Sequence, residues 1–402
     1  MDSKIKKIKL RKILDSRGNP TVECEIYSVS TFSTCSAPSG ASVGKFEAVA
    51  YPNGVDKAIE YANSNLLPKL IGADFCEQRN IDHLLREIDG TENFSKIGGN
   101  VAMVISIACA KLAAYSKEIQ LFEYLGNGRN FPLPLSKIIG GGKHALNSCD
   151  IQEFLSVPTN AKKIYPALEA NLAIHKKVAE VIVRKTTQAV GRDDESGWVA
   201  RLKTEEALEI LSSVCEAVSD EKGIKVMTGL DVAANSLFDG KGYMYKLDGK
   251  KFSKGEQIDF ILELIKKFNL AYVEDPLYEE DLGGFAELTK KAKNCLICGD
   301  DIFVTNKKKL ELGVKSKACN SIVIKPNQIG TLSDLADTVK YAKENNYTPI
   351  ASHRSGETCD DYLAHIAVAY ECKMLKTNVV GGERNTKFNE IIRIGERIGK
   401  WV

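Results

Sequence analysis

Residues 321–354 read SIVIKPNQIGTLSDLADTVKYAKENNYTPIASHR. The apolar run Ser321–Ile324 is short and rich in β-branched residues, which is typical of a buried strand. Residues 333–345 repeat apolar side chains with the period of a helix, and Thr348–Ala351 is a second apolar run of strand length. A strand, a helix and a strand in this order predict two parallel strands joined by a crossover helix.

Similar units fill the chain from Leu133 onward, and charged residues end their strands. Further strands are expected at Val226–Leu230, Ala271–Val273, Leu296–Cys298 and 374–375. The residues at the strand ends are Asp231, Glu274, Asp300, Lys325, His353 and Lys376. In a closed parallel barrel every strand ends on one rim, so these side chains would converge there. An open doubly wound sheet would need a G-x-G-x-x-G turn after its first strand, and the sequence has none.

The predicted rim carries charges that suit a metal ion and an anionic substrate. Three carboxylates on neighbouring strand ends repel one another unless a cation neutralises them, and oxygen ligands suit a hard ion such as Mg²⁺. Lys325, Lys376 and Arg354 would add positive charge for phosphate or carboxylate groups. A lysine beside a divalent cation has a lowered pKa and can remove a proton, so either lysine is a candidate general base.

The first part of the chain has a different pattern. Residues 1–128 predict a smaller α+β cap domain and residues 129–402 a barrel domain, with a Pro/Gly-rich stretch at the boundary. The cap is expected to contain strands at Ile5–Leu14 and Thr21–Tyr27, and helices at Val55–Ile71, Glu77–Ile88 and Asn100–Lys117. The last of these helices is apolar on almost every face, so we expect it to be buried.

The composition is that of a folded chain without a global electric field. Of 402 residues, 44% are hydrophobic and 27% are charged, and the formal net charge is +2. We therefore expect no nucleic-acid partner and no membrane partner held by charge. The sequence has no run of about 18 apolar residues and no apolar signal core near its start, so a cytoplasmic protein is expected. The 11 cysteines are expected to be reduced.

Six strings give the chain a family resemblance. They are LDSRGNPTVE at 14–23, PSGASVG at 38–44, DIQEF at 150–154, VEDP at 273–276, KPNQIGTL at 325–332 and SHRSGET at 352–358. From Ile13 to Ile394 the sequence resembles the enolase family, the phosphopyruvate hydratases, in its archaeal and bacterial forms. The resemblance implies an α/β fold: an enolase-type eight-stranded α/β (TIM-like) barrel with a ββαα start, preceded by a smaller α+β cap domain.

The resemblance also implies an activity. Enolases are hydro-lyases that reversibly dehydrate 2-phospho-D-glycerate to phosphoenolpyruvate in glycolysis and gluconeogenesis. The chain would act on a small phosphorylated acid and use two Mg²⁺ per active site, the second arriving with the substrate. It would form a homo-oligomer, either a dimer or an octamer.

Matching the family motifs residue by residue implies a set of site residues. The implied metal ligands are Asp231, Glu274, Asp300 and Ser42. The implied substrate-binding residues are Gln152, Lys325, Arg354, Ser355 and Lys376. The implied catalytic residues are Glu195, Lys325, His144, Glu153 and His353. Within this set the resemblance makes Lys325 the base and Glu195 the acid.

The segment around the implied acid departs from the family pattern. Where the family has Gly-Asp-Glu-Gly-Gly, residues 193–197 read DDESG, so Ser196 replaces a glycine. If φ must be positive there, Ser196 adopts it only at a cost of about 1–2 kcal/mol. The loop could therefore follow another course.

Two alternative functions stay open on the sequence. An enolase-like paralogue could bind or scaffold with little activity, which the altered segment favours and the complete rim disfavours. Another enolase-superfamily acid-sugar lyase would share proton removal beside a carboxylate, without needing the phosphate-binding string at 352–355.

Overall fold

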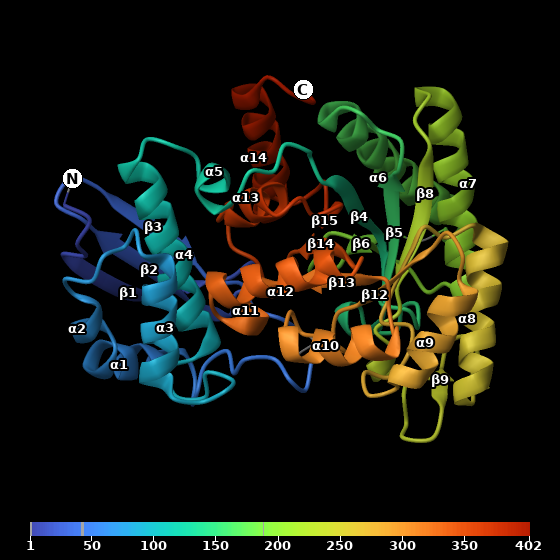
Figure 1. The fold of residues 1–402 in the computed structure, drawn as a ribbon. Helices are drawn as coiled ribbons and strands as arrows, with labels where there is room; N and C mark the ends of the chain where they lie inside the picture. The colour runs from blue at the N-terminus through green and yellow to red at the C-terminus, as the bar shows by residue number, and fades with distance from the viewer. Residues whose placement is uncertain (1, 42–43, 188) are drawn as a thin grey trace.

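The computed structural model describes residues 2–41, 44–187 and 189–402. The N-terminal part of the chain forms a small sheet with helices, and the remainder forms a barrel beside it (Figure 1). The two parts meet through helices, because α3 (Gln78–Asp89) and α4 (Gly99–Ser116) of the first part pack against α11 (Pro326–Ile329) and α12 (Leu332–Glu344) of the second.

The small sheet is antiparallel and has the strand order β1-β2-β3. Its strands are β1 (Lys7–Leu14), β2 (Pro20–Tyr27) and β3 (Phe32–Ser36). The turn between the first two strands is closed by Asp15, whose Oδ1 accepts hydrogen bonds from the N–H groups of Arg17 and Asn19. The first two strands were predicted, whereas β3 was not, because its polar residues lack a clear alternation with apolar ones.

The helices of this part are α1 (Val55–Asn65), α2 (Leu67–Leu70), α3 (Gln78–Asp89), α4 (Gly99–Ser116) and α5 (Leu121–Leu125). The single helix predicted over 55–71 is wrong. Pro68 cannot donate the backbone hydrogen bond that a helix interior needs, so it stands in the first turn of a new helix instead.

Helix α4 is the central helix of the N-terminal part, and the prediction that it is buried is confirmed. It packs against β2 and β3 on one side. Its length and mean hydropathy match those of a membrane span, but 89% of it is buried inside the fold. That burial is typical of a core helix.

Eight strands close the barrel within the described residues, in the order β4-β5-β8-β11-β12-β13-β14-β15, and β15 pairs back to β4. They are β4 (Leu133–Gly140), β5 (Glu153–Pro158), β8 (Val226–Asp231), β11 (Tyr272–Glu274), β12 (Leu296–Gly299), β13 (Ser321–Ile324), β14 (Thr348–Ser352) and β15 (Met374–Lys376). Strand β5 runs antiparallel to β4 and β8, and the other pairs are parallel. The predicted barrel and its ββαα start are confirmed.

Helices surround the barrel (Figure 1). They are α6 (Ile164–Thr186), α7 (Thr204–Lys222), α8 (Lys254–Phe268), α9 (Leu282–Lys291), α10 (Lys307–Ser316), α11 (Pro326–Ile329), α12 (Leu332–Glu344), α13 (Tyr362–Ala369) and α14 (Gly382–Ile398). Short elements in the connections are η1 (Gly142–His144), η2 (Ala234–Ser236), β6 (Gly191–Arg192), β7 (Trp198–Val199), β9 (Tyr243–Tyr245) and β10 (Lys250–Phe252).

Strand direction gathers charged side chains at one end of the barrel. Asp231, Glu274 and Lys376 are the last residues of β8, β11 and β15. Glu274 pairs with Asp231 in the parallel register of β11 and β8. Glu153 is the first residue of β5, and because this strand runs the other way it also lies beside Asp231.

We expect Lys111→Met to destabilise the fold. Lys111 Nζ on α4 lies 2.5 Å from Asp360 Oδ1, with the two side chains 9% and 7% exposed. Burial alone would raise the pKa of Asp360, but the charge and hydrogen bond of Lys111, together with the N–H groups of Ser36 and Tyr362, hold that pKa below its ordinary value. Removing the lysine leaves a buried carboxylate unpaired, which costs about 3–5 kcal/mol.

Urea unfolding measures this loss. The control is Lys308→Met, which breaks an exposed ion pair with Glu92 and should cost about 0–1 kcal/mol. Equal losses in the two variants would contradict a special role for the buried pair.

Candidate active site

A narrow polar cavity of about 40 Å³ opens at the rim of the barrel. The predicted site residues that line it are His144, Gln152, Glu153, Glu195, Asp231, Asp300, Lys325, His353, Arg354, Ser355 and Lys376. Glu274 joins this group through a hydrogen bond from Lys376. Ser42 lies outside the described residues. The structure thus gathers the predicted residues that it describes into one site.

Two lysines hold the acidic side chains of the rim. Lys376 Nζ donates to Asp231 Oδ2 at 2.9 Å and to Glu274 Oε2 at 2.6 Å. Lys325 Nζ donates to Asp300 Oδ2. Each strand-end carboxylate therefore has a lysine beside it.

The acidic set also fits a divalent cation. Burial, together with the charges of Asp231 and Asp300, raises the pKa of Glu274 to about 7 in spite of Lys376. Glu274 Oε1 is buried and has no hydrogen-bond partner among the described residues, so it can serve as a ligand. A neighbouring acidic set, Asp275, Asp300 and Asp301, has ligand atoms within 4.8 Å of one another. Carboxylate oxygens are the ligands that hard divalent cations prefer.

The protein groups around the two lysines raise their pKa values, whereas a bound cation would lower them. Burial lowers the pKa of Lys325, but the neighbouring carboxylates, Asp300 first and then Glu274, together raise it above its ordinary value. The pKa of Lys376 is likewise raised by Asp231, Glu153 and Glu274 against the effect of burial. The lowered lysine pKa expected from the sequence would therefore require charge from a bound cation.

Arg354, a predicted substrate-binding residue, is buried and donates hydrogen bonds to neighbouring side chains. Its Nη1 donates to Glu47 Oε2 at 3.0 Å and its Nη2 donates to Glu47 Oε1 at 3.2 Å. Its Nη1 also donates to Asn327 Oδ1 at 2.9 Å. Glu47 is not predictable from the sequence, because a glutamate in the connection after β3 resembles an ordinary surface charge.

A second buried arginine was also missed. Arg384, on α14, donates from Nη2 to the carbonyl oxygens of Ser355 at 2.6 Å and Asp194 at 3.0 Å. Its Nη1 lies 2.7 Å from His353 Nδ1. Arg384 therefore ties the segment that contains Arg354 to the loop that contains Glu195. A lone arginine in an amphipathic helix carries no sequence signal for such a role.

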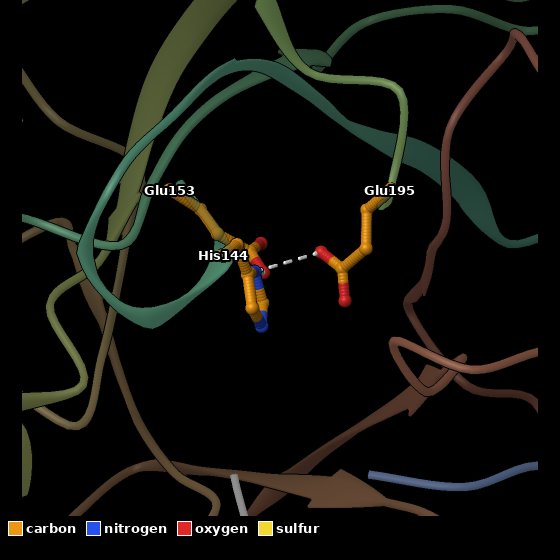
Figure 2. Close-up of side chains that lie close together, drawn as sticks. All are labelled: His144, Glu153 and Glu195. Carbon is orange, nitrogen blue, oxygen red and sulfur yellow. Dashed lines mark ion pairs between the residues drawn. The ribbon is translucent and has the colours of Figure 1, made fainter. Parts of the chain in front are cut away.

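Glu195 reaches the cavity from the loop between β6 and β7. Its Oε2 lies 3.4 Å from His144 Nδ1, and the same ring atom is 3.7 Å from Glu153 Oε1. Figure 2 shows these three side chains turned toward one another. Lys137, on β4, donates to Glu195 Oε2 at 3.1 Å.

The altered segment keeps the backbone that the family glycine would permit. Ser196 has φ +65°, in the left-handed region. His175 Nε2 lies 2.8 Å from the Ser196 carbonyl oxygen, and Asn378 Nδ2 donates to the Glu195 carbonyl oxygen at 2.9 Å. These contacts fix the loop in spite of the unfavourable φ.

The two glutamates of the site have pKa values shifted in opposite directions. Burial, with the charge of Glu195, raises the pKa of Glu153 well above its ordinary value in spite of Lys376. Burial also acts on Glu195, but neighbouring His144, Lys137 and His353 outweigh it and hold that pKa well below its ordinary value. A pair separated in this way can hold one proton between them.

A TIM-like barrel whose rim combines buried carboxylates, two lysines and an arginine is typical of an enzyme that could hold a divalent cation and bind an acidic substrate. The description "Enolase, C-terminal TIM barrel domain" matches residues 129–402, and "Enolase, N-terminal domain" matches residues 5–125. The chain belongs to the enolase family.

Curated relatives agree with this assignment. An enolase of Methanothermobacter thermautotrophicus is 49% identical over 99% of this chain and 98% of its own length. An enolase of Methanosphaera stadtmanae is 47% identical, with the same two coverages. An enolase of Archaeoglobus fulgidus is 46% identical over 98% of each chain.

We expect Ser196→Gly to stabilise the protein by about 0.5–1 kcal/mol. A left-handed conformation costs an L-residue about 1–2 kcal/mol, and the greater freedom of glycine in the unfolded chain cancels part of that gain. Ser196→Ala keeps the Cβ atom and should give no such gain. Urea unfolding of the two variants checks this, and the same stability in both would contradict strain at Ser196.

Proposed function

We propose that the chain catalyses the reversible dehydration of 2-phospho-D-glycerate to phosphoenolpyruvate in glycolysis and gluconeogenesis. This proposal rests on one observation: strand-end carboxylates, both lysines and Arg354 line a single cavity. Membership of the enolase family supports it. The direct test gives purified protein 2-phosphoglycerate and Mg²⁺ and follows phosphoenolpyruvate by its ultraviolet absorbance. Absence of product would overturn the proposal.

The substrate would be held by cationic and polar groups at the rim. Arg354 and Ser355 would bind the phosphate group, and Lys376 with Gln152 would bind the rest of the substrate. Because Glu47 engages both Nη atoms of Arg354, the phosphate would exchange with this carboxylate as partner of the guanidinium.

Asp231, Glu274 and Asp300 would hold a magnesium ion, and Ser42 would contribute to a second one that arrives with substrate. A divalent cation at these carboxylates supplies positive charge against the negative charge that develops on the substrate carboxylate. The unpartnered Glu274 Oε1 and its carboxylate neighbours support this ligand set.

Proton transfer would involve Lys325 and the glutamate pair. Lys325 Nζ would take the proton from C2, and its position beside Asp300 supports that role. The hydroxide leaving from C3 would take up a proton and depart as water. Glu195 would supply that proton, drawn from the one proton that it shares with Glu153, with His144 beside the pair and His353 on its other side.

The finer properties follow the family resemblance. We propose a cytoplasmic homo-oligomer, a dimer or an octamer, acting on a small phosphorylated acid without nucleic-acid or membrane partners. The near-zero net charge supports the absence of charge-driven partners. A scaffolding paralogue and an acid-sugar lyase are not favoured, because the residues proposed as acid, base and phosphate-binding groups line one cavity and the chain matches enolases over nearly its full length.

We expect Glu274→Gln to weaken Mg²⁺ binding, and the rate with it, by about 10²-fold, because it removes a charged ligand. Calorimetric titration with Mg²⁺ and a rate assay measure the two losses. Glu92→Gln, on a side chain 90% exposed, is the matched control and should change neither. Full turnover in excess EDTA would contradict the dependence on metal.

Lys325→Ala should abolish exchange of the C2 proton with solvent deuterium, since no other group is proposed to remove it. Lys376→Ala should mainly raise KM, because that lysine is proposed to bind substrate. Proton NMR of 2-phosphoglycerate in D₂O follows the exchange. If Lys325→Ala kept the exchange and Lys376→Ala lost it, the two roles would have to be reversed.

A further inference from the structure

Lys137 is a buried cation at the active site to which the family match assigns no role. It lies on β4, and its side chain is 1% exposed. Its Nζ lies 2.8 Å from Asp193 Oδ2, 3.1 Å from Glu195 Oε2 and 2.7 Å from His144 Nδ1. One ammonium group therefore contacts the proposed acid, the histidine beside it and an aspartate of the same loop.

Asp193 links Lys137 to the backbone of the Glu195 loop. Its Oδ1 accepts the N–H groups of Glu195 at 3.0 Å and Gly197 at 2.9 Å, while its Oδ2 faces Lys137. The Asp193 side chain is fully buried. The aspartate therefore connects the loop to the strand that carries the lysine.

Gly140, at the end of β4, makes room for this arrangement. A Cβ atom at that position would lie 1.8 Å from Asp193 Oδ2, and 2.8 Å from the carboxyl carbon of the same side chain. No larger residue would leave the carboxylate where it is. The ion pair between Lys137 and Asp193 therefore requires a glycine at position 140.

Charged and titratable groups face Glu195 from every element packed against it. They are Lys137 from β4, His144 from η1, Glu153 from β5, His353 after β14, Arg384 from α14 and Asp193 from its own loop. Burial lowers the pKa of both imidazoles, and each Nδ1 atom faces a cation, Lys137 for His144 and Arg384 for His353. Arg384 is turned toward carbonyl oxygens and His353. Among these groups, Lys137 is the ammonium that donates a hydrogen bond to the Glu195 carboxylate.

We propose that Lys137 is a positioning residue for Glu195, which orients the carboxylate toward the substrate and keeps it ionised. The proposal rests on the proposed function, because Glu195 matters only if the chain interconverts 2-phosphoglycerate and phosphoenolpyruvate. In the hydration direction the carboxylate form of Glu195 takes a proton from the water that adds at C3. Lys137 then sets the pH at which this form is lost.

The experiment compares Lys137→Met with Lys137→Arg, using the rate of phosphoenolpyruvate hydration as a function of pH. Removing the cation raises the pKa of Glu195, so the carboxylate becomes protonated at higher pH. The acidic limb of the pH–rate profile therefore moves to higher pH. Lys137→Arg keeps the charge and should keep the limb near its original position. We also expect Lys137→Met to lose about 10²-fold in rate at neutral pH, the scale of a misplaced catalytic group.

Two further variants separate this effect from loss of stability. Lys111→Met removes a buried, paired lysine away from the site and should leave the limb unmoved. Glu195→Gln cannot titrate, so it should lose hydration at every pH. Exchange of the C2 proton depends on Lys325 and should continue at a near wild-type rate in Lys137→Met. If Lys137→Met folds poorly, Lys137→Met/Asp193→Asn removes both charges and should show the same shifted limb.

The outcomes distinguish the two proposals. If the wild-type protein converts no 2-phosphoglycerate, the proposed function fails. If the wild type is active but Lys137→Met keeps the original limb, or loses C2 exchange as strongly as hydration, the positioning role of Lys137 is wrong and the proposed function stands.

Discussion

The structure depends on neutralising the carboxylates that one end of the barrel brings together. Asp231, Glu274 and Glu153 lie on adjacent strands, and Lys376 contacts all three, at 2.9, 2.6 and 3.2 Å. Buried ions without partners would cost several kcal/mol each. The lysine reaches them from β15, which pairs with β4 where the barrel closes. Closure of the sheet therefore also places the lysine that neutralises the carboxylates of the rim.

The reversed strand serves the same constraint. If β5 ran parallel to its neighbours, its first residue would lie at the other end of the barrel, about 17 Å away over five residues. Running antiparallel, it places Glu153 beside Asp231 and within 3.7 Å of His144. A second glutamate then joins the site without a further strand end. The paired pKa shifts of Glu153 and Glu195 follow from this placement, since burial alone would raise both.

The parts of the fold and site that sequence could predict are those with a regular spacing. Short apolar runs that end in charged residues identified the barrel and its rim, because strand ends alternate with helices at intervals of one unit. Lys137, Glu47 and Arg384 could not be predicted this way, because each is a charged residue whose burial depends on partners distant in the chain. Strand β3 was not predicted because its residues lack a clear apolar alternation. The helix break was not predicted because the apolar spacing continues past Pro68.

The segment around Glu195 shows how a motif can change while the backbone conformation that a glycine would permit is kept. Ser196 adopts a positive φ that glycine would adopt readily. His175 contacts the carbonyl oxygen of Ser196, and Asn378 donates to the carbonyl oxygen of Glu195. Lys137 and Asp193 hold the same loop through side-chain charge and backbone N–H groups. The course of the loop is thus set by contacts to its main-chain atoms, which do not require the family residues, and Lys137 contacts the carboxylate itself. Departures from the motif are therefore weak grounds for regarding the chain as an inactive paralogue.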